Sequence, residues 1–325
     1  MTDLQYIAKT NDMRADTATS SPRPLKVGVN MQIVEGALAG KTACWADLLA
    51  FAQRAEALGF DSLWVPDHLV LTWGERTRGI WEGWSLLAAL AAVTSRIEIG
   101  SLVANTGLRN PALLAKMADT VDEISGGRLI LGLGAGWSGP EEAAFGYPSG
   151  HRVDRFEEAL QIIAPLLRAG HVDFACRYYQ ARDCELRLRG PRPNGPPILI
   201  GAKGARMLRL AAAYADFWNA EGPLRQPEDI IPLREAGDAA CVAVGRDPAT
   251  LGRSASVVVN LPMGQRWGEQ GTPARDSQPT SPEQIAATLR GYAREGLSHI
   301  QLWLSPSTIE GLDWFASVLD LLDRD

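Results

Sequence analysis

Two neighbouring polar residues, Asp67 and His68, follow the apolar run Ser62–Val65, which has the pattern of a buried strand. Histidine is the side chain best suited to moving a proton near neutral pH, and a nearby carboxylate can orient its ring. A histidine at the start of a surface loop can also have no chemical task. Because it directly follows a strand, we predict that His68 transfers a proton and that Asp67 orients it.

Alternating glycines follow a second apolar run, Leu129–Leu133. Glycine has no side chain, so a flat or anionic group can approach the backbone closely. Tight packing between strands would explain the same glycines, and this alternative stays open. We predict that the segment contacts a cofactor through Gly134, Ala135, Gly136 and Trp137.

A second glycine-containing turn leads into a predicted helix and carries two cationic side chains. Amide groups at the N-terminus of a helix favour anions, and lysine and arginine add charge and donors. An ordinary glycine turn is the alternative. We predict a phosphate site built from Gly201, Ala202, Lys203, Gly204 and Arg206.

The segment Leu69–Gly83 is long for a connection and contains Trp73 and Trp81. Long loops beside an active site often shape a pocket, and aromatic side chains suit a planar ring. Either tryptophan could instead only pin the loop. We predict that both line the substrate pocket, together with Asn30 and Trp218.

Eight short apolar runs alternate with helical patterns, which indicates a parallel sheet. Eight units favour a closed (β/α)8 barrel of the TIM type, an α/β fold, over an open doubly wound sheet. Such a barrel places its active site and loop insertions at the C-terminal ends of the strands. A small β excursion is expected over 172–180. The predicted strands are Val27–Met31, Ser62–Val65, Ile97–Val103, Leu129–Leu133, Ile198–Gly201, Asp216–Asn219, Ser256–Leu261 and His299–Leu304.

The predicted helices have clear start and stop signals. Asn110-Pro111 supplies an N-cap and a first helical residue, and Gly126-Gly127 ends that helix. Ser281-Pro282-Glu283-Gln284 is a capping box. The other expected helices are Trp45–Leu58, Trp84–Val93, Val153–Arg168, Ala205–Tyr214, Glu228–Val244 and Ile309–Leu322.

Length and composition are those of a soluble enzyme-sized domain. The chain has 325 residues and a net charge of −6, which disfavours a nucleic-acid groove. There is no apolar run of about 18 residues for a membrane span. Residues 1–24 are polar and are expected to be a flexible tail, followed by a single domain over 25–325. We expect a cytoplasmic protein whose four cysteines are reduced thiols.

Several familiar motifs are missing or incomplete. The chain has neither a P-loop nor a G-x-S-x-G elbow. Its histidines are scattered without the spacing of metal ligands, so no metal site is expected. Gly134–Gly139 matches G-x-G-x-x-G, but Pro140 follows and no second strand comes at the required distance, which disfavours a Rossmann unit.

Four stretches, in order, resemble the luciferase-like flavin and deazaflavin oxidoreductases. The resemblance covers residues 25–220 well and the last third loosely. It is carried by Ala57-Leu-Gly-Phe-Asp-Ser-Leu-Trp-Val-Pro-Asp-His68, by Thr94–Ser101 with Arg109–Ala115, by Ser125–Trp137, and by Pro197–Gly204 with Tyr214–Asn219.

The resemblance implies a flavin or deazaflavin ring across the barrel mouth, with its phosphate near Gly201–Arg206. It also implies a non-proline cis peptide near Leu102-Val103. Cofactor contacts would then include Ser101, Leu102, Val103, Asn105 and Thr106.

Asp67-His68 resembles a pair common in the branch that uses the deazaflavin coenzyme F-420. One departure is Trp137, where the sugar-phosphate dehydrogenases of that branch carry a glutamate. This departure puts sugar-phosphate oxidation in doubt. Homodimers are usual in the family, and a homodimer is expected here.

Three functions remain open at this point. The first is hydride transfer between coenzyme F-420 and a small organic substrate, with His68 moving the proton. The second is a monooxygenase that uses reduced FMN and oxygen. The third is a catalytically silent barrel that only binds a flavin. The sequence does not name the substrate, which would be selected by loops such as Leu69–Gly83 and Gln265–Thr280.

Overall fold

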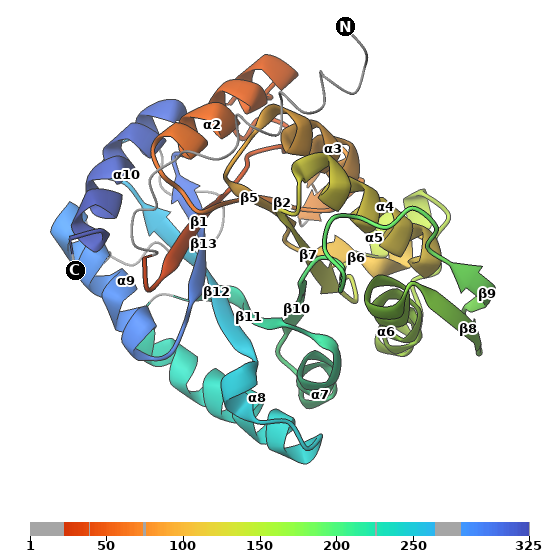
Figure 1. Ribbon diagram of the computed structural model, residues 1–325. Helices are drawn as coiled ribbons and strands as arrows, with labels where there is room; N and C mark the ends of the chain where they lie inside the picture. Colours follow the sequence, from red (N-terminus) through yellow and green to blue (C-terminus); the bar gives the residue numbers. More distant parts are fainter. Residues whose placement is uncertain (1–22, 39, 74–75, 225, 264–280, 325) are drawn as a thin grey trace, which may run out of the picture.

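The computed structural model describes residues 23–38, 40–73, 76–224, 226–263 and 281–324. Eight parallel strands form a closed barrel, in which β13 pairs with β1 and β10 pairs with both β7 and β11. The strands lie at the centre of Figure 1 with the helices around them. The predicted (β/α)8 barrel is therefore confirmed. Its strands are β1 (Lys26–Asn30), β2 (Ser62–Val65), β5 (Glu98–Ser101), β7 (Leu129–Gly134), β10 (Ile198–Ala202), β11 (Phe217–Leu224), β12 (Gly252–Asn260) and β13 (His299–Ser305).

The outer ring of helices begins and ends close to the predicted residues. Asn110 caps α4 by accepting hydrogen bonds from the N–H groups of Ala112 and Leu113, and Gly126 ends the helix with a φ of 67°. The capping box at Ser281 is present at the start of α9. The helices of the ring are α2 (Trp45–Ala57), α3 (Gly83–Val93), α4 (Pro111–Ser125), α6 (Arg152–Ala169), α7 (Ala205–Tyr214), α8 (Ile231–Ala243), α9 (Pro282–Arg294) and α10 (Ile309–Leu322).

The third barrel strand is shorter than predicted. The apolar run 97–103 suggested one strand, but β5 ends at Ser101 and the chain turns aside through Leu102 and Val103. It then forms the two-residue strand β6 (Ala104–Asn105), which pairs with the end of β7. Hydrophobicity continues through this break, so the apolar pattern could not reveal it.

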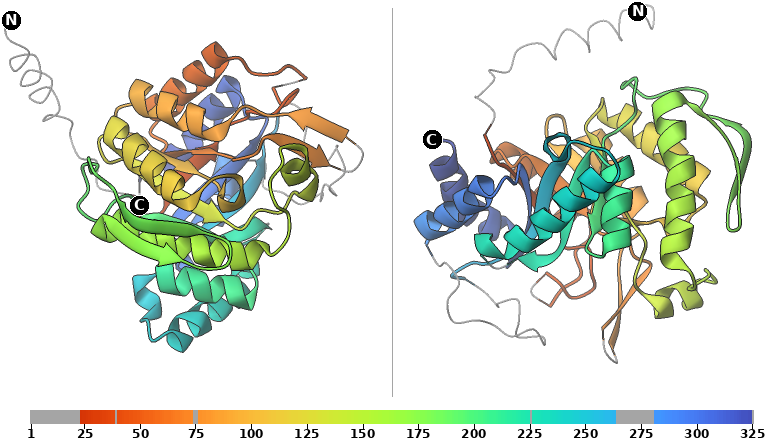
Figure 2. Two further views of the ribbon diagram at one scale, coloured as in Figure 1. Left: turned by 90° about the vertical axis from the view of Figure 1, so that its right-hand side faces the viewer. Right: turned by 90° about the horizontal axis from the view of Figure 1, so that it is seen from below.

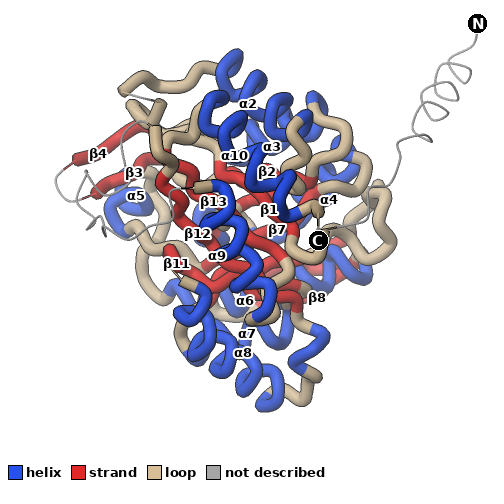
Figure 3. The backbone as a smooth tube through the Cα atoms, turned by 90° about the vertical axis from the view of Figure 1, so that its left-hand side faces the viewer, coloured by secondary structure: helices blue, strands red, loops and turns tan. Residues whose placement is uncertain are grey.

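Two insertions follow strands at one end of the barrel. The loop after β2 contains an antiparallel hairpin of β3 (Val70–Trp73) and β4 (Arg76–Gly79). The short helix α5 (Gly139–Ala144) follows β7. Figures 2 and 3 show the hairpin and α5 side by side at this end. A third insertion, the hairpin of β8 (His171–Ala175) and β9 (Gln180–Glu185), accounts for the predicted β excursion and lies beside α6 (Figure 1).

Large side chains fill the barrel interior at positions where neighbouring strands carry glycine. A Cβ atom on Gly100 would lie 2.4 Å from the ring of Trp64, and one on Gly28 would lie 2.5 Å from its Nε1 atom. Trp64 packs there with Ile130 and Leu199, separately from the larger core between strands and helices. The indole of Trp64 therefore occupies space that the two glycines leave open.

Other expected segments lie outside the described residues. These are the loop over 265–280 and the predicted tail, apart from its last two residues. Within the described ranges, none of the helices has both the length and the apolar character needed to cross a membrane.

Candidate active site at the barrel mouth

His68 lies three residues beyond β2, and its main partner is a carboxylate on α5. Its Nδ1 atom lies 3.0 Å from Oε2 of Glu141, whose side chain is fully buried. The ring of Trp137 meets the imidazole edge to face, with centroids 5.3 Å apart. The structure thus brings together His68 and Trp137, which the sequence selected, and Glu141, which it did not.

Asp67 does not orient His68, and this part of the sequence prediction is wrong. Its carboxylate accepts two hydrogen bonds from Arg109, at 2.7 and 3.0 Å, and one from the backbone N–H of Asn105 at 3.0 Å. Burial raises the pKa of the Asp67 carboxyl, and the Arg109 guanidinium opposes this shift. Asp67 therefore anchors the chain at β6, while Glu141 contacts the histidine.

Arg109 extends this anchor to a helix. Its Nη2 atom donates to Glu82 Oε1 at 2.6 Å, and the Glu82 carboxylate also caps α3 by accepting from the N–H groups of Trp84 and Ser85. The pairs join the end of β2, β6 and the start of α3, with the Asp67 carboxylate buried and the Glu82 carboxylate 40% exposed. Through Asp67 they reach the backbone N–H of Asn105.

The segment between β5 and β6, with the end of β7 that it contacts, is the predicted cofactor platform. The peptide bond between Leu102 and Val103 is cis, as the resemblance implied. A Cβ on Gly134 would lie 2.6 Å from Cγ2 of Val103, and one on Gly136 would lie 2.4 Å from Nδ2 of Asn105. Gly136 also has a φ of 74°, which favours glycine. The side chains of Val103 and Asn105 therefore occupy the space that the two glycines leave open.

Two hydroxyl groups of the predicted cofactor site are already used inside the protein. Ser101 Oγ donates to the carbonyl of Gly132 at 2.8 Å, and Thr106 Oγ1 donates to that of Gly134 at 3.3 Å. Both residues are buried. Their side chains connect the third strand region to β7, which is a structural contribution to the platform.

The predicted phosphate turn lies between β10 and α7, but only part of it is free to bind. Gly204 is the N-cap of α7 and has open space where a Cβ would project, and Lys203 is exposed. Arg206, in contrast, binds Asp154 and Glu157 of α6, each at 2.5 Å. Hydrogen bonding to Arg206 holds the pKa of Asp154 below its usual value. In this arrangement Arg206 supports the turn and does not face a ligand.

The four residues predicted for the substrate pocket separate into different places. Trp218 is buried and packs against α8, where a Cβ on Gly237 would touch its ring, so its assignment to the pocket is wrong. Alternate strand residues face opposite sides, and Trp218 falls on the outer side. Trp81 is half exposed and donates from Nε1 to the carbonyl of Ala43 at 2.8 Å, so it pins the loop. Trp73 ends β3, and its side chain lies outside the described part of the structure.

Asn30 lies inside the barrel at the end of β1. Its Nδ2 atom donates to the carbonyl of Leu302 at 3.2 Å, while Oδ1 has no partner among the described residues. Nε2 of Gln301, on the next strand, is likewise buried and unpaired in the described residues. Buried polar atoms are normally hydrogen-bonded, so this pair marks a place where a polar group could bind.

A flavin or deazaflavin fits the residues at the mouth. Asn105 Nδ2 and Ser138 Oγ are buried atoms without a hydrogen-bond partner in the described ranges, and each can serve a polar ligand. The Gly204 turn has open space where a Cβ would project, and it offers helix N–H groups and Lys203 to an anion. The roles of the predicted cofactor contacts stay predictions.

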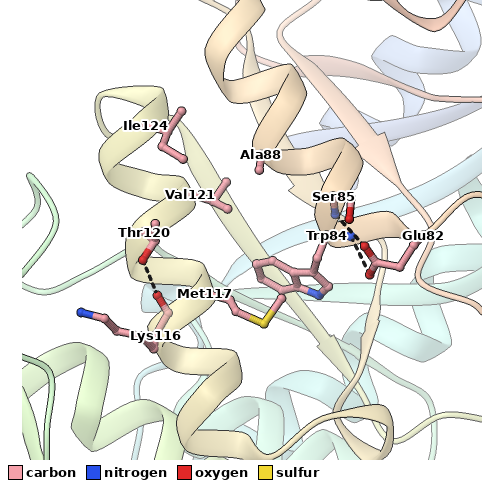
Figure 4. A pocket seen from close by; sticks show the side chains of 9 residues that line it. All are labelled: Glu82, Trp84, Ser85, Ala88, Lys116, Met117, Thr120, Val121 and Ile124. Atoms are coloured by element: carbon pink, nitrogen blue, oxygen red, sulfur yellow. Dashed lines mark hydrogen bonds between the residues drawn. The ribbon is translucent and has the colours of Figure 1, made fainter. Parts of the chain in front are cut away.

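A separate groove lies outside the barrel wall, between α3 and α4. It has a volume of about 300 Å³ and is lined mainly by apolar side chains. Figure 4 shows Trp84 and Ala88 of α3 facing Met117, Val121 and Ile124 of α4. Its position on the helix layer separates it from the residues that could do chemistry.

Glu141 and Arg109 are the site residues that the sequence did not single out. Glu141 comes four residues after Trp137, beyond the end of a predicted barrel strand. A carboxylate in that position is a candidate partner for any histidine on the same rim, and this signal could have identified it. The sequence analysis included Arg109 only in the motif Arg109–Ala115. Its pairing with Asp67 could not be inferred, because the two residues are 42 positions apart.

Curated relatives include a monooxygenase and an F420-dependent dehydrogenase. The chain is 34% identical over 209 residues to the pyrimidine monooxygenase RutA of Stutzerimonas stutzeri, covering 61% of this chain and 56% of that protein. It is 35% identical over 217 residues to the F420-dependent hydroxymycolic acid dehydrogenase of Mycobacterium tuberculosis, covering 65% and 58%. The chain thus matches little more than half the length of these relatives.

A solved structure shares the fold over nearly the whole chain. It is an F420-dependent secondary alcohol dehydrogenase in complex with an F420-acetone adduct, with a TM-score of 0.76 and 20% identity over 93% of this chain and 99% of that chain. The family model described as luciferase-like monooxygenase matches residues 25–263. With the match spanning most of the barrel, this chain belongs to the luciferase-like monooxygenase family.

Proposed function

We propose that the protein is an oxidoreductase that binds coenzyme F-420 at the barrel mouth and transfers a hydride to or from a small organic substrate. The observation that carries this proposal is the placement of His68. The imidazole lies 3.0 Å from a buried carboxylate, at the same end of the barrel as the buried, unpaired Nδ2 atom of Asn105. An acid–base group beside a bound cofactor is the arrangement that cofactor-dependent redox chemistry requires.

The bound deazaflavin would supply the hydride acceptor or donor. The chain's own residues would do the rest. Asn105 and the glycine-rich end of β7 would hold the ring, and the Gly204 turn with Lys203 would hold the phosphate. His68 would take the hydroxyl proton of an alcohol as the hydride leaves the adjacent carbon, and would return it in the reverse direction. The name of the mycobacterial dehydrogenase supports an alcohol or ketone as the reacting group.

A reduced-FMN monooxygenase is the second candidate. The similarity to the pyrimidine monooxygenase of Stutzerimonas stutzeri favours it. The same platform and the same histidine would serve, with His68 as a proton donor and the β3–β4 hairpin limiting the access of water. A barrel that binds a flavin without turnover is the remaining alternative.

Cofactor titration distinguishes the two redox functions. Purified protein would be titrated with oxidised coenzyme F-420, with FMN and with reduced FMN, following tryptophan fluorescence. We expect tight binding of the deazaflavin and weak binding of both forms of FMN. The opposite preference would overturn the main proposal and direct assays to oxygen consumption. Trp137 is 51% exposed beside His68, so Trp137→Phe should remove much of the quenching without preventing binding.

The proposal includes a homodimer that works in the cytoplasm, with residues 25–325 as one functional unit. The wall formed by α3 and α4 supports the dimer. None of the 11 residues of α3 is charged, and Leu113 and Ile124 of α4 are about half exposed. A helix that is apolar on all sides is normally covered, which supports a second copy on this face.

A further inference from the structure

The side chain of Glu141 contacts three nitrogen atoms. Oε1 accepts from the backbone N–H groups of Leu69, in a short contact, and Val70, at 3.4 Å. Oε2 faces Nδ1 of His68 at 3.0 Å. The carboxylate is fully buried, so these contacts replace the water that it would otherwise bind.

The two oxygens have different partners. Backbone N–H groups can only donate, so the atom that faces Leu69 and Val70 must be an acceptor. In glutamate either oxygen meets this requirement, and the other one then faces the histidine. An ionised carboxylate has no donor, so the hydrogen in the contact with His68 must come from Nδ1.

We propose that Glu141 is a positioning residue that keeps neutral His68 protonated on Nδ1 and leaves Nε2 as the proton acceptor at the barrel mouth. The hydrogen bond made by one ring nitrogen of a histidine determines which nitrogen carries the proton. Trp137 contacts the ring edge to face and opposes its rotation. The role of Nε2 in catalysis rests on the proposed function, whereas the position of the proton does not.

The substitution Glu141→Gln gives a sharp test because it replaces one acceptor atom with a donor. The N–H groups of Leu69 and Val70 require the carbonyl oxygen of the glutamine, so its NH₂ group must face His68. Nδ1 then has to accept, and the proton moves to Nε2. The expected result is an inverted tautomer in a ring that has hardly moved.

Nitrogen-15 NMR of the histidine side chains measures this directly and needs no cofactor. The chain has only four histidines, and His68→Asn assigns the signal. At pH 8 we expect the Nδ1–H tautomer for His68 in the wild type and the Nε2–H tautomer in Glu141→Gln. An Nε2–H tautomer in the wild type, two protonated nitrogens at that pH, or an unchanged signal in the variant would overturn the proposal.

Two further variants serve as controls. Glu142→Gln changes the neighbouring buried carboxylate, which binds Arg152, and should leave the tautomer of His68 unchanged. Asp67→Asn should leave it unchanged too, because Asp67 binds Arg109. The signals of the other histidines report whether each variant is folded. If Glu141→Gln does not fold, Glu141→Asp replaces it, and there a retained Nδ1–H tautomer supports the proposal while an Nε2–H tautomer overturns it.

Turnover gives a second readout once the cofactor is known. Loss of a general base costs about 100- to 10,000-fold in rate. We expect kcat of Glu141→Gln to fall in this range while the affinity for the cofactor stays within about threefold. The double variant with His68→Asn should be no slower than His68→Asn alone, because the two residues act as a unit. An unchanged tautomer would contradict the inference about Glu141, whereas an inverted tautomer in a protein that binds neither cofactor would contradict only the proposed function.

Discussion

Asp67 and Arg109 form a two-pronged ion pair, with the guanidinium nitrogens 2.7 and 3.0 Å from the two carboxylate oxygens. The carboxylate is almost fully buried, and the guanidinium is 11% exposed. The Asp67 carboxylate also accepts a hydrogen bond from the backbone N–H of Asn105. Asp67 therefore binds the backbone of β6 and does not bind His68, its neighbour in the sequence.

Removing Arg109 should be costly because it leaves the buried Asp67 carboxylate without its counter-ion. Breaking one side of a buried pair costs about 3–5 kcal/mol. We expect Arg109→Leu to lower the free energy of unfolding in urea by that amount. The matched control is Arg206→Leu, which breaks ion pairs that are 38–45% exposed and should cost at most about 1 kcal/mol. Equal losses in the two variants would contradict the anchoring role of Arg109.

The barrel was predictable from sequence because each of its elements has a local signal. The start of α4 at Asn110-Pro111 and the capping box at Ser281 are such signals, and alternating strands and helices fix the parallel sheet. The cis peptide bond at Leu102-Val103 was expected from the family resemblance, and the hydrophobic pattern did not indicate it. Local patterns were sufficient wherever neighbours in the chain determine the structure.

The parts that could not be predicted depend on contacts between distant residues. His68 and Glu141 are 73 residues apart, and Asp67 and Arg109 are 42 apart. Nothing in the sequence next to Asp67 indicates that its partner is Arg109. Trp218 was misplaced because a single strand residue can face either side of the sheet, and the helix that covers it lies elsewhere in the sequence. Side-chain pairing across the fold is the information that one sequence lacks.

The turn at Gly204 should tolerate a methyl group in the free protein but not in the complex. A Cβ at this position meets no atom within 4 Å, and the backbone has an extended conformation that alanine adopts freely. Gly204→Ala should therefore keep the melting temperature within a few degrees. A phosphate bound against the N–H groups of α7 would meet the new methyl group, so cofactor affinity should fall about tenfold or more in fluorescence titrations.

The charge of Lys203 gives a second test of the proposed phosphate site. Lys203→Ala should weaken cofactor binding and reduce its dependence on salt, because an exposed charge acts through screened attraction. Lys116→Ala is the control, since Lys116 binds the backbone carbonyl of Arg187 on the outside of the barrel. Equal effects of the two substitutions would argue against a phosphate site at Lys203.

The apolar wall of α3 and α4 predicts how the dimer can be broken. Leu113→Lys and Ile124→Lys place charges on side chains that are 53% and 45% exposed. If a second copy covers this face, either change should convert a dimer into a monomer in sedimentation experiments at micromolar concentration. Val242→Lys on α8 is the control, because Val242 is 68% exposed on another side. A dimer that survives the first two changes would place the interface elsewhere.

The buried histidine at the bottom of the barrel predicts a pH dependence of stability. His299 Nε2 lies 2.7 Å from the hydroxyl of Ser62, and the ring meets that of Trp64 edge to face. Burial, helped by the charge of Lys26, lowers the pKa of His299 from 6.5 to about 3. Between these values the unfolded chain binds a proton that the folded protein does not, so the free energy of unfolding decreases as the pH falls below 6.5.

One such proton contributes about 1.4 kcal/mol per pH unit well inside this window. His299→Gln cannot take up the proton, so urea unfolding between pH 6 and 4.5 should show a shallower loss of stability, by about 2 kcal/mol over the range. The slope is the readout, because the variant also loses the ring contact with Trp64 at every pH. His171→Gln changes an exposed histidine and should keep the wild-type slope. A wild-type slope in His299→Gln would mean that the buried ring takes up its proton in the folded state, which would require the barrel floor to open to water.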